Sequence, residues 1–325
     1  MQIIVKTSYP KGWLSYTDQI KRLRERGLEI NDEESAKRFL AYSNYYRFTG
    51  YCLCFQHYDA QTHERLFNKG TTFEDVFDIF NLDVELRDCI SEALELVEIS
   101  FRSVVAYNFS HAYGPFGHTN AANFLRSFTT RRSDANGSLQ PSRYEEWHED
   151  LINETKRSNE LFVKHFEQKY QQFPDLPIWT ALEICSFGTL SKMFANMLRI
   201  DMRPIAMQYA LQASTLDSWL HTFVYVRNIC AHHSRLWDKK LAIAPQLPPG
   251  KMWDPVRPSA SRTFSVAMLL NWMLAHDSFE PSVHSAWKNR MKRIMDGFFA
   301  RFPRQTSLHT GFPKAWESLE VWSAV

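Results

Sequence analysis

The sequence is poor in the residues that mark several classes of protein. Its 325 residues include only 11 glycines, which argues against a β architecture with many tight turns. Five cysteines, an odd number in a long chain, do not have the pattern of a disulfide framework. Cys52 and Cys54 lie too close in sequence for a zinc half-site of the usual spacing, and no second pair follows. We therefore expect neither disulfides nor a structural metal.

Long apolar runs and a strong net charge are also missing. No run of about 18 apolar residues occurs, so no transmembrane helix is predicted. The first residues, Met1 to Pro10, lack the basic-then-apolar pattern of a signal peptide. We therefore expect a cytoplasmic protein with no membrane partner. A net charge of +2 neither favours nor excludes a nucleic-acid partner, so any such case rests on local patches.

Apolar and aromatic residues, in contrast, are plentiful. Hydrophobic residues make up 44% of the chain and aromatic residues 14%, which is enough for a sizeable core. The length allows one large domain or two ordinary ones.

The spacing of these apolar residues predicts an all-α protein. From Phe73 to about Ser110 they recur every three or four positions, after a cap formed by Thr72 and Asp75. Nearly forty residues without proline or glycine predict one very long helix, or two with a bend near Asn81. Further helices are predicted over residues 15–28, 31–47, 143–172, 179–185, 189–198, 214–240, 258–276 and 281–301.

Local signals divide the chain into three parts. Asn31 is the expected cap of the second helix, with Glu34 at the third position, and the aromatic stretch 51–58 suggests a short strand. A proline-rich connector follows residue 245. We expect an N-terminal helical and aromatic segment over residues 1–70, a helical core over 71–245 and a C-terminal helical extension over 246–325.

One segment combines residues that suit chemistry on a phosphate. Residues 226–237 read V-R-N-I-C-A-H-H-S-R-L-W. If the helix continues, Asn228, His232 and Arg235 share one face, and Arg227 lies about 140° round from His232. Arg227 must then reach round the helix, the helix must bend, or a second copy must contribute. His233 falls nearer the apolar stripe, which favours a structural role for it.

These residue types suit cleavage of RNA without a metal or cofactor. His232 can take or give a proton near neutral pH. Arg227 can hold a phosphate by two parallel hydrogen bonds and offset its developing charge. Asn228 can orient the imidazole, and Arg235 can be an auxiliary phosphate contact. Periodicity alone favours a different interpretation, in which these residues form a polar rim on a core helix.

Several strings resemble the abortive-infection (Abi) family of bacterial defence proteins, of the AbiD/AbiF-like type. The twelve-residue string above is similar to that family's signature. Further strings match in order over roughly residues 10–240: L-R-E-R-G-L at 23–28, N-Y-Y-R-F-T-G-Y at 44–51, E-I-S-F-R at 98–102, and P-I-W with S-F-G at 177–188. One departure is Asp238, where the family often has asparagine.

The resemblance implies an HEPN-like helical bundle with additional N- and C-terminal helices. It implies that Arg227, Asn228 and His232 correspond to the R-polar-x-x-x-H motif of HEPN ribonucleases. Two such motifs usually face each other in those proteins, so a homodimer with a composite site is implied. The function implied is anti-phage defence by an endoribonuclease, with a 2′-hydroxyl as nucleophile and RNA as substrate or regulator.

Two other groups of residues are candidates for auxiliary roles. Glu98 and Arg102, four apart, form either a helix-stabilising ion pair or, on the resemblance, a pair that orients the site. The best basic patch lies between residues 288 and 304, and is either an RNA-binding face or a solvated one. Its RNA-binding candidates are Lys288, Arg290, Lys292 and Arg293.

Two main rival functions stay open, and a metal-dependent hydrolase, which full activity in EDTA would exclude, is a distant third. The motif could serve binding or folding in a non-catalytic RNA- or protein-binding module. The chain could also be the toxin of a pair restrained by an antitoxin or another partner protein. Cleavage that requires both Arg227 and His232 separates the catalytic reading from the first rival.

Overall fold

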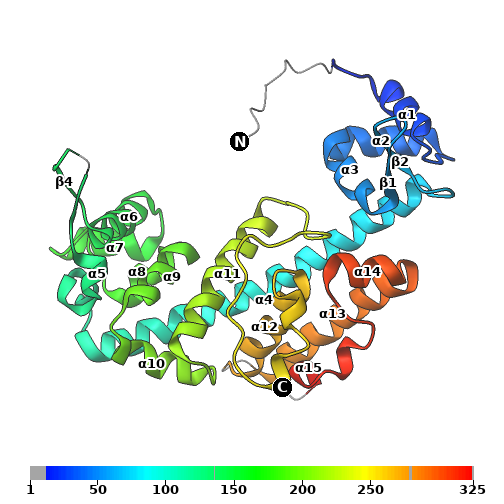
Figure 1. Ribbon diagram of the computed structural model, residues 1–325. Coiled ribbons are helices and arrows are strands. Elements are labelled where there is room, and N and C mark those ends of the chain that lie inside the picture. The colour runs from blue at the N-terminus through cyan, green and yellow to red at the C-terminus, as the bar shows by residue number, and fades with distance from the viewer. Residues whose placement is uncertain (1–11, 135, 278–279, 324–325) are drawn as a thin grey trace. The chain divides into compact units, whose positions relative to one another are not determined.

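The structure is a computed structural model that describes residues 12–134, 136–277 and 280–323. Within these residues there are 15 α-helices and two small antiparallel sheets of two strands each. The prediction of an all-α protein is therefore confirmed. The chain divides into two compact units, Met1–Val84 and Glu85–Val325, and each is described by itself (Figure 1).

The first unit begins with three helices: α1 (Tyr16–Glu25), α2 (Glu33–Ser43) and α3 (Tyr45–Cys52). Ser15 caps α1 by accepting from the amide of Asp18. The cap of α2 is Asp32 and not Asn31, so that prediction was wrong by one residue. Asparagine and aspartate cap helices equally well by accepting a hydrogen bond from an amide of the first turn, so the sequence does not show which of two adjacent residues is the cap. The predicted second helix is also split, because Asn44 has a φ of 69°.

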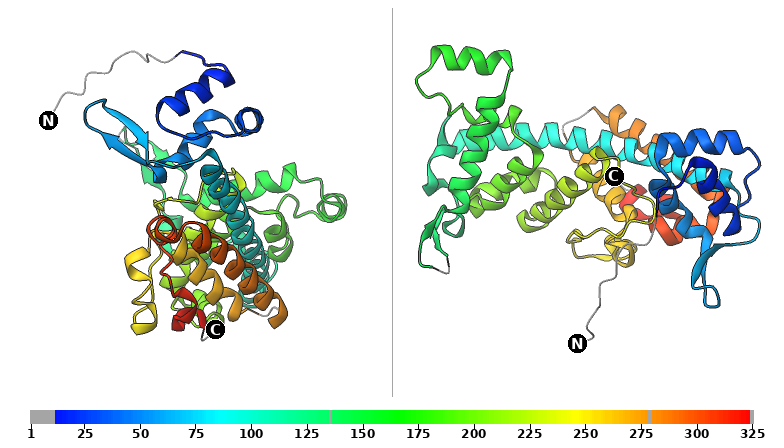
Figure 2. Two further views of the ribbon diagram at one scale, coloured as in Figure 1. Left: turned by 90° about the vertical axis from the view of Figure 1, so that its right-hand side faces the viewer. Right: turned by 90° about the horizontal axis from the view of Figure 1, so that it is seen from above.

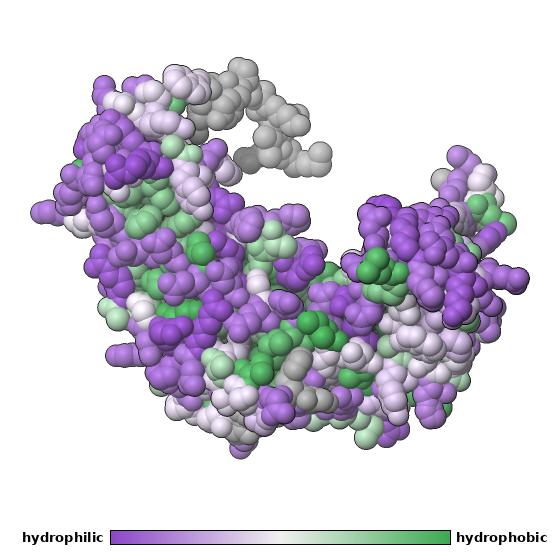
Figure 3. Space-filling view, turned by 180° about the vertical axis from the view of Figure 1, so that it is seen from behind, coloured by the Kyte–Doolittle hydropathy of each residue, from purple (hydrophilic) through white to green (hydrophobic). Residues whose placement is uncertain are grey.

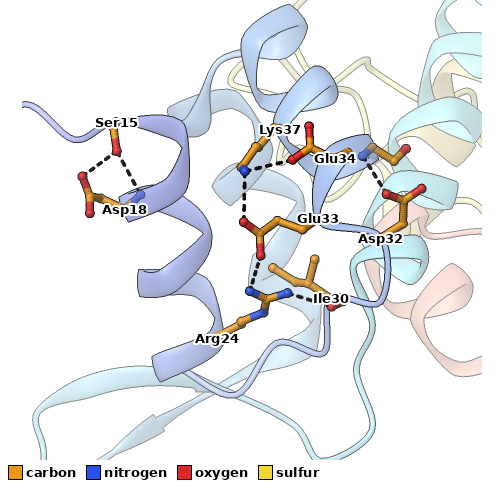
Figure 4. A network of polar contacts seen from close by, with 9 residues as sticks. Ser15, Asp18, Arg24, Ile30, Asp32, Glu33, Glu34 and Lys37 are labelled. Atoms are coloured by element: carbon orange, nitrogen blue, oxygen red, sulfur yellow. Dashed lines mark hydrogen bonds and ion pairs between the residues drawn. The ribbon is translucent and has the colours of Figure 1, made fainter.

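Ion pairs join α1 to α2 (Figure 4). The guanidinium of Arg24 contacts Glu33 at 2.7 Å and donates to the carbonyl of Ile30 at 3.1 Å. Lys37 contacts Glu33 at 3.1 Å and Glu34 at 3.0 Å. These side chains are largely exposed, so they fix the approach of the two helices more than they add to stability.

An aromatic core lies beneath these helices. Phe39 makes edge contacts with several phenylalanine rings, and Tyr51 donates to Asp83 at 2.7 Å while almost fully buried. A hairpin of β1 (Gln56–Asp59) and β2 (Glu64–Phe67) completes the unit. The expected strand over residues 51–58 is thus only partly right, because its first residues belong to α3.

A single helix of 41 residues, α4 (Phe73–Tyr113), continues from the first unit into the second. Thr72 and Asp75 form the expected capping box, with each side chain bonded to the other's amide. Of the two predicted forms, one long helix or two with a bend, the continuous helix is the one found.

The second unit has most of its helices after α4. Short elements lead to α6 (Arg143–Arg157), which is followed by α7 (Leu161–Lys169), α8 (Ile178–Ile184), α9 (Phe187–Asn196), α10 (Arg199–Gln208) and α11 (Ala213–Ala231). The short elements are α5 (Arg126–Thr129) and a hairpin of β3 (Arg132–Ser133) and β4 (Leu139–Gln140). The predicted helix over 143–172 is divided into α6 and α7.

Four helices close the second unit: α12 (Thr263–Ala275), α13 (Pro281–Arg301), α14 (Pro303–Thr310) and α15 (Glu320–Ser323). Nearly all of α12 is buried, so it is the centre of this part. Trp287 of α13 donates to the carbonyl of Cys89 at 2.9 Å, which fixes α13 beside the part of α4 that belongs to the second unit (Figure 2).

All five cysteines are free thiols. Four of them are buried, including Cys230 in the last turn of α11, and Cys54 is partly exposed. Among the described residues, no group of three or more His, Cys, Asp or Glu side chains is placed to hold a metal ion.

No helix within the described ranges is both long and apolar enough to span a bilayer. On the face shown in Figure 3, apolar residues form small patches among polar ones.

Candidate functional site

The motif residues lie at the carboxyl end of α11. The helix ends at Ala231, with His232 as its C-cap, and not near residue 240 as predicted. The amide of His233 donates to Cys230 and that of Ser234 to Ile229, both at 2.9 Å. This pair of bonds is a Schellman motif, which normally has glycine at its left-handed position. Here His233 occupies that position with a φ of 52°.

Arg227, Asn228 and His232 are all exposed at this helix end. Within the described chain their side chains form no hydrogen bond or ion pair, with each other or with other residues. The expected orientation of the His232 imidazole by Asn228 is therefore not present in this single copy. These three polar side chains, which contact no partner in the part of the chain that the structure describes, are available to a ligand or to a second copy of the chain.

The early end of α11 changes the prediction for two neighbours. Arg235 lies beyond the helix, so the argument that it shares a helical face with His232 was wrong, although it is only a few residues away. The side chain of His233 is exposed and not packed on the apolar stripe as expected. Its backbone closes the helix by donating to the carbonyl of Cys230.

Glu98 and Arg102 form a largely buried ion pair. They are 2.7 Å apart, and their side chains are only 15% and 12% exposed. Arg102 also donates to the carbonyl of Cys185 at 3.2 Å, just before α9. Gly188 of α9 lies close to α11, because a methyl group added at this glycine would be only 3.8 Å from the side chain of Val224. The pair thus supports the turn that packs against α11.

A partly buried carboxylate without a signal in the sequence lies at the same turn. Glu154 of α6 accepts from the amide of Ser186 at 3.4 Å and from the hydroxyl of Thr189 at 3.3 Å. Burial raises the pKa of Glu154 in spite of these bonds. Its sequence context, a helix rich in charged residues, gives no signal that separates it from the exposed acids nearby.

The basic patch on α13 is largely engaged within the chain. Lys288 donates to the carbonyl of Trp322 at 2.7 Å, and burial lowers its pKa. Arg290 contacts Glu92 at 2.6 Å, and Lys292 contacts Asp296 at 2.9 Å. Arg293 is exposed. The role of these four residues in RNA binding stays a prediction, and three of them would have to leave or share an internal partner.

Asp238, the departure noted above, has two side-chain partners of its own. Its carboxylate lies 2.8 Å from Nδ1 of His309 and 3.2 Å from the guanidinium of Arg262. Burial alone would raise the pKa of Asp238, but His309, Arg235 and Arg262 outweigh it and lower the pKa. The negative charge next to the motif is therefore offset within the chain.

Comparison with known proteins agrees with the signature strings. A family model described as Abi-like protein matches residues 38–238, which is more than half of the chain and includes the whole motif. Searches of curated proteins and of solved structures found no match.

Proposed function

The chain belongs to the Abi-like protein family, and from that membership we propose that it acts in abortive infection as a metal-independent endoribonuclease in the cytoplasm. The observation that carries the proposal is the exposure of Arg227, Asn228 and His232 at the end of α11, where their side chains have no partner among the described residues. A histidine, an arginine and an asparagine exposed at one helix end supply residue types that suit acid–base chemistry on a phosphate.

The chemistry follows from the residue types. His232 removes the proton from a ribose 2′-hydroxyl or protonates the 5′-oxygen that leaves. Arg227 holds the phosphate and stabilises the charge that develops on it. The 2′-oxygen bonds to phosphorus as the bond to the 5′-oxygen breaks. The products are a 2′,3′-cyclic phosphate and a 5′-hydroxyl.

The arrangement supports an HEPN-like homodimer with a shared site. Arg227 and His232 are five positions apart, so they point about 140° apart on a regular helix. Within the described residues of one copy, no hydrogen bond joins them. A symmetric dimer would allow the arginine of one copy and the histidine of the other to contact one phosphate.

The first test is cleavage of total cellular RNA in EDTA by the wild type, Arg227→Ala and His232→Ala. His221→Ala and Arg203→Ala are matched controls, since both residues are exposed on neighbouring helix surfaces. Each motif variant should lose roughly 10²–10³-fold in rate, and the controls should cleave normally. Cleavage that survives in both motif variants would exclude the assignment, and RNA binding without cleavage would favour a non-catalytic module.

A mixing experiment tests the shared site. Arg227→Ala and His232→Ala copies, each inactive alone, should together recover about one quarter of wild-type activity, because half of random dimers are mixed and each keeps one intact site of two. Wild-type cleavage without any recovery on mixing would argue against a site shared in this way.

A further inference from the structure

The segment that follows His232 is fixed by residues distant in sequence. The carboxylate of Asp238 is shared by His309 and Arg262, and Arg262 also donates to the carbonyl of His309 at 3.4 Å. The three side chains are 26%, 14% and 29% exposed. We call Asp238, Arg262 and His309 the Asp238 cluster. Ion pairs this shielded from water contribute more than surface pairs do.

The residue before Asp238 strengthens this attachment. Trp237 is fully buried. Its ring is stacked on Phe298 of α13, with centroids 5.1 Å apart and planes at 9°, and the ring of His309 lies 5.5 Å away. An aromatic ring buried between α13 and α14 restricts the chain on both sides of it.

Hydrogen bonds to the backbone of this segment continue the attachment on either side. The hydroxyl of Thr263, at the start of α12, donates to the carbonyl of Leu236 at 3.4 Å. The amide of Leu241 donates to the carbonyl of Ser261 at 2.8 Å. Residues 236–241 are therefore bound to the part of the chain that contains α12, α13 and α14.

The backbone itself shows that Asp238 is constrained. Its φ is 53°, in the left-handed region that residues other than glycine rarely adopt. Such a conformation persists when surrounding contacts hold it. His233 has a φ of 52°, so the short segment after His232 has a constrained residue at each end.

The distant partners described above, Arg262, Phe298 and His309, lie outside the residues that match the family. The match ends at Asp238, whereas Arg262, Phe298 and His309 come later. We propose that residues 239–325 position the candidate site, and that Asp238, Arg262 and His309 are positioning residues that fix the segment following His232. This inference rests on the proposed ribonuclease function for its catalytic consequence, but not for the attachment itself.

Hydrogen–deuterium exchange of the full chain tests the attachment. The amides of His233 and Ser234 are bonded to α11, so their exchange reports on this helix end. Asp238→Asn keeps the shape but removes the charge. Peptides covering residues 232–241 should then exchange about fivefold faster, because a charged hydrogen bond exceeds a neutral one by about 1 kcal/mol. Asp150→Asn, at an exposed ion pair with Lys192, is the control and should change nothing there.

Kinetics of RNA cleavage by the same variants test the positioning. Asp238→Asn should lower kcat with little change in KM, and Asp150→Asn should leave both unchanged. Unchanged exchange at residues 232–241 would overturn the inference, as would faster exchange with an unaltered kcat. If the wild type does not cleave RNA, the proposed function fails, and the exchange result alone decides whether residues 239–325 fix the segment after His232.

Discussion

The left-handed conformation of His233 leads to a prediction about stability. His233→Gly should be more stable than His233→Ala. A φ of 52° costs an L-residue about 1–2 kcal/mol, whereas glycine adopts it freely. Glycine also makes the unfolded chain more flexible than alanine does, which lowers the free energy of unfolding by about 0.4–1 kcal/mol. The free energy of unfolding of His233→Gly should therefore exceed that of His233→Ala by about 1 kcal/mol. Both variants lack the imidazole, so contacts of that side chain cancel in the comparison.

Urea unfolding followed by tryptophan fluorescence measures this difference. Of the 10 tryptophans only Trp13 precedes residue 85, so the signal reports on the second unit. The midpoints of the two variants should differ by about 0.3 M urea. Ala231→Gly is the matched control, because Ala231 is the last helical residue and glycine should destabilise it by roughly 0.5 kcal/mol. An alanine variant at position 233 as stable as the glycine variant would refute the reasoning.

Three further predictions concern the second unit, each measured by the same urea unfolding. Arg102→Met should lower stability by about 2 kcal/mol by leaving Glu98 unpaired in a largely buried place; wild-type stability would show that the pair contributes nothing. Gly117→Ala should cost about 1–3 kcal/mol, since the new methyl would lie 2.2 Å from Cβ of Tyr113; a neutral result would contradict that close contact. Burial lowers the pKa of His118 to about 3 from its ordinary 6.5, so stability from this group is complete above pH 6.5 and falls as pH drops towards 3. Between pH 6.5 and 5 the loss should be about 2 kcal/mol, and His118→Leu should lack it; an equal loss in that variant would assign it to other groups.

The sequence predicted elements whose signals are local. α4 was recognised because its cap and its apolar spacing agree over its whole length. The end of α11 was missed because Schellman motifs usually show glycine, and His233 carries no such signal. α10 was missed because Pro204 lies within it, and proline normally argues against a helix.

The residues of the candidate site also fall into those that the sequence identifies and those that only the structure shows. Arg227, Asn228 and His232 are found within one short string, which the family signature covers. The partners of Asp238 are not readable from the sequence, since Arg262 and His309 are distant in sequence and only folding brings them together. Glu154 was hidden because an acid that becomes buried has the same local pattern as an exposed one.

The buried thiol of Cys230 gives this helix end a chemical reporter of its own. Cys230 is 6% exposed and lies in the final turn of α11, directly between Arg227 and His232 in sequence. A thiol reagent can modify it only when that turn opens, so the rate of labelling measures how often the turn opens. Once the partly exposed Cys54 is replaced by serine, Cys230 can be followed against the other buried cysteines in the intact protein. RNA that closes on the motif would protect this thiol, and binding could then be detected without any cleavage.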